Sequence, residues 1–223
     1  MTAIRVGRAQ RTGLVFAVFA VFAAFVIWTF IYLTHYPPTV AAAAATAPGE
    51  ANITMQTVGA IGTEPHPPWV SYLVQRPNGT WVHTTVLKVP AHSTVHVTIY
   101  QYDSGSDLRN PLMNQVQGVG DATVNGKPYS MWTDAIGHTF TVPQLGISVP
   151  LPGIPDDAKN PCSTNAPCSP SFDHMKIQFT FQTGAAGTYT WQCFVPCGVG
   201  YIAGFGGPMS TVGYMNGVLQ VTA

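Results

Sequence analysis

The chain has 223 residues, of which 8% are charged and 46% are hydrophobic, and its formal net charge is zero. A chain without excess positive charge is not expected to bind nucleic acid or another polyanion as its main partner. Its 22 glycines and 19 prolines favour turns over long helices, and its length allows one domain of moderate size with appendages.

The first predicted element is an apolar helix from Gly13 to Leu33, a run of 21 residues without a charge. Such a helix is roughly 30 Å long, which matches the hydrocarbon core of a bilayer. Three arginines precede it within the first 12 residues, and no acidic residue does. The positive-inside rule therefore predicts a cytoplasmic segment 1–12, a single transmembrane helix 13–34 and an extracytoplasmic remainder of a cell-membrane protein. The alternative is a cleaved signal peptide, although this apolar run is longer than the usual core of one.

The composition of the residues after this helix predicts an Ala/Pro-rich linker at 35–51 and a β-rich exported domain at 52–223. Several short apolar runs separated by turn signals indicate a β-sandwich or a barrel. The predicted strands are 69–75 and 80–89 around an Asn78-Gly79 turn, then 93–102, 138–142, 174–183, 187–195 and 217–223. Residues 103–126 are expected to form a loop excursion, and residues 143–170 a proline-rich connection.

The most informative motif lies near the C-terminal end of the sequence. Cys193 and Cys197 follow a predicted strand at a spacing of four, and Met209 and Met215 come after them in glycine-rich sequence. His138 opens another predicted strand. Thiolates, an imidazole and a weak thioether are the ligands that copper takes in small β-sandwich proteins. The motif therefore predicts a copper site, either of one ion or of two.

Four stretches then resemble the cupredoxin family in their order along the chain, and in particular the exported copper domain of cytochrome c oxidase subunit II. That family carries His-Ser-Phe-x-Val-Pro-x-Leu-Gly, and this chain has His138-Thr-Phe-Thr-Val-Pro-Gln-Leu-Gly146. The family also ends in Cys-x3-Cys-x3-His-x2-Met before a last strand. The resembling stretches are 89–100, 137–147, 187–198 and 214–221, with an unmatched insertion at 103–132.

The resemblance implies an all-β, cupredoxin-like Greek-key β-sandwich on a single N-terminal transmembrane helix. It implies that His138 is a histidine ligand, that Cys193 and Cys197 are the thiolates of a dinuclear copper centre, and that Met215 is the axial ligand. The second histidine of the family is missing from this chain. Its position is Tyr201 when counted from the cysteines.

Counted back from Met215, the same position is Val212, because a glycine-rich segment is inserted in the loop. Three interpretations stay open. One copper is held by His138, the two cysteines and Met215 or Met209. Alternatively, His174, His96 or a partner's histidine completes a dinuclear site. In the third, the metal is absent and the two cysteines form a disulfide.

A separate pair, Cys162 and Cys168, frames a short loop in exported sequence, where a disulfide is expected. His66, His83 and His96 are expected to be solvated or hydrogen-bonded side chains rather than ligands.

No hydrolase motif is present, so the chain is not expected to be catalytic alone and is at most an electron-transfer subunit of an oxidoreductase complex. The resemblance implies one-electron transfer, with an exported electron-carrier protein, subunits of a membrane redox complex and the lipid bilayer as partners. The alternatives are a metal-free accessory subunit of a membrane oxidase or monooxygenase, and a Cu(I) delivery protein.

Overall fold

The computed structural model describes residues 7–34, 39–59, 69–83, 86–106, 110–159, 166–197, 207–210 and 213–223. The chain divides into two compact units, residues 1–35 and residues 36–223.

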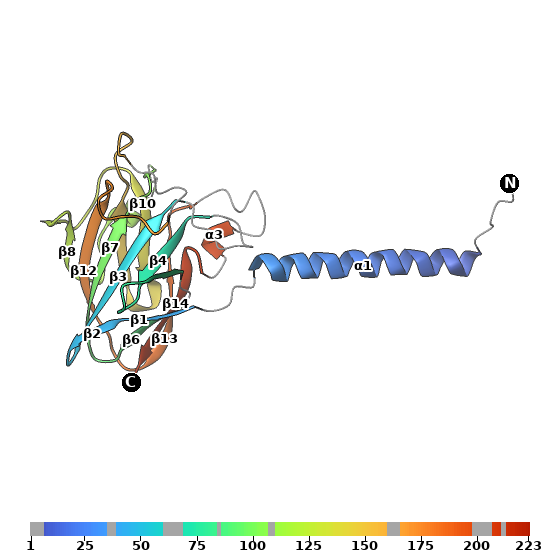
Figure 1. Cartoon of the computed structure of the whole chain (residues 1–223), viewed down its shortest axis with the longest axis horizontal. Coiled ribbons are helices and arrows are strands. Elements are labelled where there is room, and N and C mark those ends of the chain that lie inside the picture. Colours follow the sequence, from blue (N-terminus) through green and yellow to red (C-terminus); the bar gives the residue numbers. More distant parts are fainter. Residues whose placement is uncertain are drawn as a thin grey trace. The chain divides into compact units, whose positions relative to one another are not determined.

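The first unit contains α1 (Arg8–Thr34), an uninterrupted helix of 27 residues (Figure 1). Its segment Arg11–Tyr32 is long and apolar enough to cross a membrane. Large apolar side chains such as Phe19 and Phe22 are about two-thirds exposed within the described structure. A helix that is apolar on all sides suits a lipid environment better than water. The predicted N-terminal apolar helix is therefore confirmed as a candidate membrane span.

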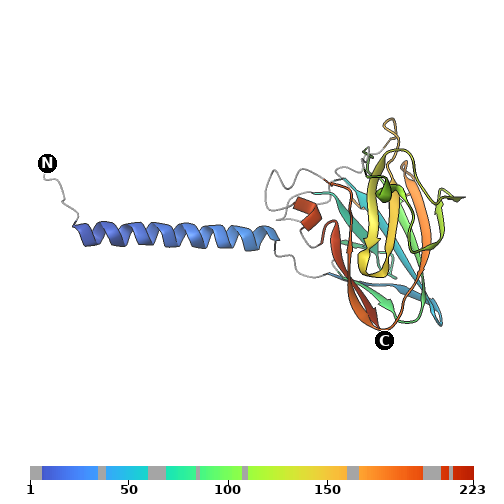
Figure 2. The same ribbon diagram turned by 180° about the vertical axis from the view of Figure 1, so that it is seen from behind.

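The second unit consists of two β-sheets that face each other (Figures 1 and 2). One sheet has the order β1 (Val40–Ala42), β6 (Val86–Pro90), β14 (Asn216–Thr222), β13 (Gly187–Gln192), β10 (Ile136–Val142) and β11 (Ile147–Pro152). The other has the order β5 (Trp81–His83), β4 (Ser71–Gln75), β3 (Glu50–Val58), β7 (Thr94–Gln101), β12 (Met175–Gln182), β8 (Gly120–Val124) and β9 (Lys127–Pro128), and β2 (Ala44–Ala47) pairs with β3. The predicted all-β sandwich is confirmed.

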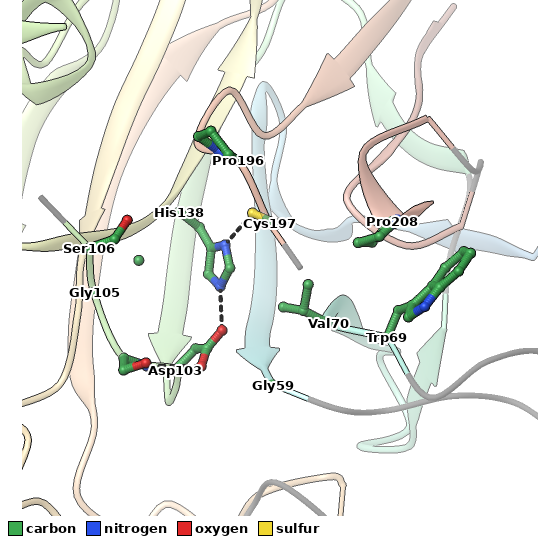
Figure 3. Close-up of a pocket in the computed structure, with 12 residues that line it drawn as sticks. Gly59, Trp69, Val70, Asp103, Gly105, Ser106, His138, Pro196, Cys197 and Pro208 are labelled. Carbon is green, nitrogen blue, oxygen red and sulfur yellow. Dashed lines mark hydrogen bonds and ion pairs between the residues drawn. The ribbon is translucent and has the colours of Figure 1, made fainter. Parts of the chain in front are cut away.

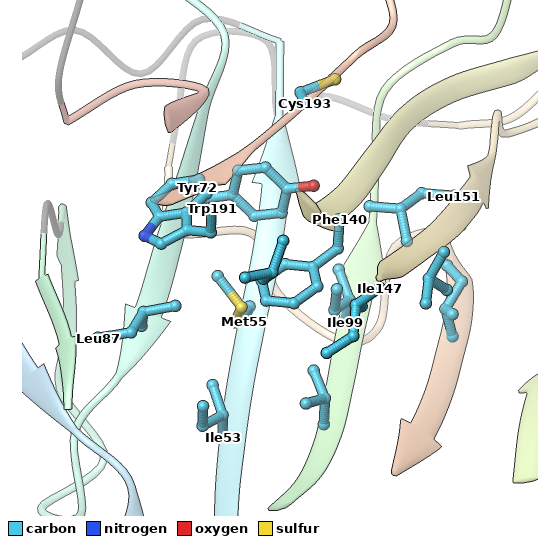
Figure 4. Packing of buried hydrophobic residues seen from close by; sticks show 14 of the residues in the cluster. Ile53, Met55, Tyr72, Leu87, Ile99, Phe140, Ile147, Leu151, Trp191 and Cys193 are labelled. Atoms are coloured by element: carbon cyan, nitrogen blue, oxygen red, sulfur yellow. The ribbon is translucent and has the colours of Figure 1, made fainter. Parts of the chain in front are cut away.

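The core forms where the apolar faces of the two sheets meet. β7 shows how sequence alternation produces it, because Val95, Val97 and Ile99 are buried while the intervening residues are more accessible. Tyr72 of β4 and Trp191 of β13 stack edge to face at 5.2 Å and are both fully buried (Figure 4). This aromatic pair joins the two sheets just beneath the end of β13, where the cysteine loop begins.

The segment predicted as a linker contributes two short strands instead of only a tether. β1 pairs in parallel with β6, and β2 pairs antiparallel with β3. Strand pairing uses backbone groups, so the alanines in this segment are compatible with it, and the small side chain of Ala41 is buried. The sequence analysis missed these edge strands, because an alanine-rich segment lacks the alternation of large apolar and polar residues from which a strand is predicted.

The proline-rich connection contains β11, a strand that the sequence pattern did not predict. β11 lies at the edge of its sheet and pairs only with β10 among the described strands. Pro150 and Pro152 have no N–H to donate, which an edge strand tolerates because one side of it needs no ladder partner. The prolines therefore indicated an edge strand rather than a loop.

The insertion packs over the β10–β11 pair. It contains η1 (Pro111–Asn114) together with β8 and β9. Gln117 exchanges two backbone hydrogen bonds with Ser148 of β11, and the Tyr129 hydroxyl donates to the Pro150 carbonyl at 2.8 Å. β10 itself lies between β13 and β11 and is buried along its whole length, which places His138 in the interior.

Candidate metal centre

The pairing of β10 with β13 brings the histidine and the cysteines together. Thr141 of β10 lies opposite Gln192 of β13, and the chain leaves β13 directly into Cys193. His138 precedes Thr141 on the same strand and faces the loop that contains both cysteines. Residues 55 to 59 positions apart in the sequence thus meet at one end of the sandwich.

His138, Cys193 and Cys197 form a compact buried cluster. The Nδ1 atom of His138 lies 3.0 Å from the sulfur of Cys197 and 3.8 Å from that of Cys193, and the two sulfurs lie 3.3 Å apart. One ligand atom from each residue lies within 4.8 Å of the others, and all three residues are buried. Both cysteines are free thiols in this structure. Three of the predicted ligands therefore converge.

The carbonyl oxygen of Val195 turns toward the same point from inside the cysteine loop. The thiols of Cys193 and Cys197 lie 3.5 Å and 3.1 Å from it. Val195 itself is buried, so this carbonyl faces the sulfurs rather than water. The sequence analysis did not identify this oxygen, because its direction depends on how the loop between the two cysteines folds.

Thr139 ties the strand of His138 to the loop of the cysteines. Its N–H donates to the Cys193 sulfur at 3.4 Å, and its hydroxyl accepts from the N–H of Phe194 at 2.8 Å. Its carbonyl accepts from the hydroxyl of Tyr72 at 3.0 Å. Thr139 therefore links the ligand cluster to the pair of Tyr72 and Trp191, and Figure 4 shows Cys193 beside this pair.

Asp103 lies on the other side of the His138 ring. Its Oδ2 atom is 3.1 Å from Nε2 of His138, while Nδ1 of the same ring faces the sulfur of Cys197 (Figure 3). Asp103, His138 and Cys197 line a pocket of about 340 Å³ together with Trp69, Pro196 and Pro208. Asp103 was not predicted as part of the site, because it comes from the unmatched insertion and only the fold brings it near His138.

The protonation of the cluster follows from burial and from these contacts. Burial alone would lower the pKa of His138, but the hydrogen bond to Asp103 and the interaction with Cys193 raise it to about 9. Burial alone would raise the pKa of Asp103, whereas the hydrogen bond and charge of His138 and the N–H of Ser104 bring it below its usual value. The histidine therefore lies between two groups that favour its charged form.

The two thiols behave as a pair that shares one proton. Burial would raise the pKa of Cys193, but the hydrogen bonds from Cys197 and His138 lower it well below its usual value. The pKa of Cys197 is raised far above the usual range, because Cys197 donates that hydrogen bond, is buried and faces the negative charges of Cys193 and Asp103. The metal-free cluster thus stabilises one thiolate beside one thiol.

Met215 and Met209 lie on the chain segment that returns to the last strand. Met215 is fully buried, and its carbonyl accepts from the N–H of Cys193 at 2.8 Å. Met209, in α3 (Gly207–Ser210), is half-buried, and its carbonyl accepts from Asn216 at 2.8 Å. The backbone therefore brings Met215 next to a cysteine of the cluster, and the role of either methionine as a ligand stays a prediction.

The other histidines named as possible ligands are engaged elsewhere. Nδ1 of His174 donates to the Phe172 carbonyl at 2.7 Å, and the His174 ring packs edge to face against Tyr100. His96 is hydrogen-bonded to Glu50 on an exposed face.

His83 is buried and is hydrogen-bonded to Ser71 at 2.7 Å. His66, Tyr201 and Val212 lie outside the described residues. Within the described part of the chain, His138 is thus the histidine of the cluster.

The predicted disulfide between Cys162 and Cys168 stays a prediction. Cys168 is buried, and its N–H donates to Gln56 at 2.7 Å. Cys162 lies outside the described residues.

The donor set of the cluster fits copper. Two sulfurs and an imidazole nitrogen are soft or borderline ligands, and such sets select copper or zinc over magnesium or calcium. They are arranged around a common point, they are shielded from water, and one sulfur already favours the thiolate form that a metal requires.

No protein-family model matches the chain, and no curated protein matches it. Rusticyanin from Thiobacillus ferrooxidans is similar in structure, with 16% identity, a TM-score of 0.38, and coverage of 85% of this chain and 86% of that chain. A chain of a heme-copper terminal oxidase dimer is also similar, with 14% identity, a TM-score of 0.33, and coverage of 96% and 100%. Both TM-scores lie below 0.5, so these likenesses carry no argument about the chain. The structure itself establishes a two-sheet β-sandwich, and its cupredoxin-like character stays what the sequence resemblance implies.

Proposed function

We propose that this chain is a membrane-anchored electron-transfer subunit that binds one copper ion through His138, Cys193 and Cys197. The observation that carries the proposal is the buried cluster of three ligand groups, whose ligand atoms lie within 4.8 Å of one another. Met215 is the methionine that we assign as a further ligand, because its backbone carbonyl accepts a hydrogen bond from the N–H of Cys193. The copper ion supplies a one-electron couple between its two oxidation states.

The protein's own contribution is to hold the ligands in place and to exclude water. His138 is 2% exposed and Cys193 is fully buried, so both lie in a dry environment. The N–H of Thr139 points at the Cys193 sulfur, where a hydrogen bond stabilises negative charge. A site whose ligands are fixed before the electron arrives needs little rearrangement on transfer.

The partners follow from the anchor and from the chemistry. A helix the length of α1 holds the domain at a bilayer, which supports the proposal that the electron acceptor is a membrane redox complex. The arginines that precede the apolar run support a cytoplasmic N-terminus and an extracytoplasmic β domain. The electron donor is then an exported electron-carrier protein. The similarity of the sequence motifs to subunit II of cytochrome c oxidase supports the same assignment.

The test is to load the full-length protein, purified in detergent with its thiols reduced, with copper and to measure metal content, visible absorption and electron paramagnetic resonance. One copper per chain with intense thiolate-to-copper absorption supports the proposal. Two coppers with a mixed-valence signal contradict the mononuclear assignment. One colourless Cu(I) that a chelator removes readily favours copper delivery instead. If the reduced protein retains no copper, the chain is a metal-free accessory subunit.

A further inference from the structure

Asp103 makes the one contact that the described structure gives to the outer nitrogen of His138. The carboxylate Oδ2 atom lies 3.1 Å from Nε2, and the opposite nitrogen, Nδ1, lies 3.0 Å from the Cys197 sulfur. The ring therefore lies between the carboxylate of Asp103 and the sulfur of Cys197, as Figure 3 shows. Asp103 stands 35 positions before His138 and opens the insertion for which the sequence resemblance has no counterpart.

The position of Asp103 is fixed by its neighbours. Its Oδ1 atom accepts from the N–H of Ser104 at 2.9 Å, and its backbone carbonyl accepts from the N–H of Ile154 at 3.0 Å. Its own N–H donates to the side chain of Gln101 at 3.3 Å. One carboxylate oxygen is thus engaged by the backbone, and the other is left to accept from His138. Because three hydrogen bonds fix Asp103 in place, its carboxylate can orient the ring of His138.

The surroundings of Asp103 also leave little room at the glycine before His138. A Cβ atom at Gly137 would meet the side chain of Gln101 and would lie 2.9 Å from the backbone carbonyl oxygen of Ser104, so a larger residue there requires this segment to shift. The residue that precedes the ligand and the residue that orients it are therefore packed against the same buried glutamine.

We propose that Asp103 is a positioning residue, which holds the Nε2–H of His138 so that Nδ1 is the nitrogen presented to a metal beside the two sulfurs. A neutral imidazole carries one proton, and only its unprotonated nitrogen binds a metal. A carboxylate at Nε2 keeps the proton on that side and keeps Nδ1 as the acceptor. The importance of Asp103 for copper rests on the proposed function, whereas its control of the ring does not.

The test uses the full-length protein in detergent with Asp103→Ala and Asp103→Asn. The amide oxygen of asparagine still accepts from Nε2–H, so this variant is expected to rescue the effect of losing the carboxylate. Asp134→Ala is the matched control. Asp134 is exposed and close to His138 in sequence, and its carboxylate accepts from the N–H of Ala135.

The first readout needs no metal. Nitrogen chemical shifts of ¹⁵N-labelled histidine, recorded on the reduced metal-free protein at a pH where the ring is neutral, report which nitrogen of His138 carries the proton. Wild type, Asp103→Asn and Asp134→Ala are expected to show the Nε2–H form. Asp103→Ala is expected to lose it, either to the Nδ1–H form or to a mixture. An unchanged ring in Asp103→Ala, or an Nδ1–H ring in wild type, would overturn the proposal.

The second readout is the Cu(I) affinity, measured by competition with a chelator. Loss of a carboxylate that is hydrogen-bonded to a ligand histidine typically weakens metal binding by about 10- to 100-fold. The same range is expected for Asp103→Ala. Asp103→Asn is expected to show a smaller loss of Cu(I) affinity, and Asp134→Ala is expected to bind Cu(I) as tightly as wild type. Equal affinities in all four proteins would overturn the role of Asp103 toward copper. If the Nε2–H form depends on Asp103 but wild type binds no Cu(I), the orienting role is supported and the proposed function fails.

Discussion

The sulfur atoms of Cys193 and Cys197 lie 3.3 Å apart, within hydrogen-bonding distance of each other. The four-residue spacing alone does not produce this contact. The loop is bent by the Thr139 hydroxyl, which accepts from Phe194, and by the carbonyl of Met215, which accepts from Cys193. The two cysteines are therefore presented by the sandwich as a preformed pair beside His138.

The two candidate methionines are expected to differ when each is replaced by leucine. Leucine has nearly the volume of methionine, so the fold is expected to lose less than about 1.5 kcal/mol in either variant. Met215→Leu is expected to keep the copper but to shift its absorption maximum and its reduction potential, because a weak axial ligand tunes both. Met209→Leu is expected to leave both unchanged. A shift in Met209→Leu alone, measured by absorption and redox titration, would transfer the axial role to that residue.

The hydroxyl of Tyr72 is expected to stabilise the fold at the site through its hydrogen bond to the Thr139 carbonyl. Tyr72→Phe leaves the buried carbonyl of Thr139 without this donor, which costs about 1–3 kcal/mol of unfolding free energy. Tyr189→Phe, on the half-buried surface of β13, is the control and is expected to change the free energy little. The measurement is thermal unfolding of the metal-free protein. Equal stability of the two variants would show that the hydrogen bond from Tyr72 to Thr139 does not contribute to the free energy of unfolding.

The stability of the reduced, metal-free protein is expected to depend on pH in a specific way. The pKa of His138 is raised from 6.5 to about 9, so its contribution is complete below pH 6.5 and is lost as the pH rises through about 9. The pKa of Cys193 is lowered from 9.0, so its contribution is lost as the pH falls and is gained as the pH rises toward 9. The two contributions oppose each other, and Tm is expected to change little between pH 6.5 and 9.

Above pH 9 the stability is expected to fall. The pKa of Cys197 is raised, so this thiol keeps its proton in the folded state after it has ionised in the unfolded chain. Thermal unfolding from pH 6 to pH 10 in the presence of a reductant and a chelator measures the profile. A steep loss of Tm already between pH 6.5 and 8 would contradict the pairing of His138 with Cys193.

The candidate membrane span is expected to fail when a charge is placed in its middle. Phe22 lies near the centre of the Arg11–Tyr32 segment, and a lysine there costs about 2.5–3.5 kcal/mol on insertion scales. Phe22→Lys is therefore expected to lower the fraction of protein that resists alkaline extraction from membranes, while Phe22→Leu is not. Equal extraction of the two variants would argue against α1 as the anchor.

The sequence predicted those parts of the fold that a local pattern determines. The uncharged run identified the helix, and the alternation of Val95, Val97 and Ile99 identified β7. The Asn78-Gly79 turn was found between β4 and β5, as expected. β6 was not separated from β5 in the prediction, although the two belong to different sheets, because a change of sheet leaves no mark in the alternation of side chains.

The site was predicted as far as its residues lie in recognisable motifs. His138, Cys193 and Cys197 were named from the sequence, and the structure brings them together. Asp103 was not named, because an isolated aspartate 35 positions away carries no local signal and depends on how the insertion packs against β10. Tyr72 was missed for the same reason, since its bond to Thr139 joins two sheets.

The central claim is that the two cysteines bind copper as thiolates, and one titration tests it most directly. Copper is added to the reduced full-length protein, to Cys193→Ser and Cys197→Ser, and to His174→Gln as a control with a histidine outside the cluster. Wild type and His174→Gln are expected to retain about one copper per chain with intense thiolate-to-copper absorption, and both serine variants are expected to lose that absorption. Wild-type protein that retains no copper, with both thiols shown to be free, would contradict the claim.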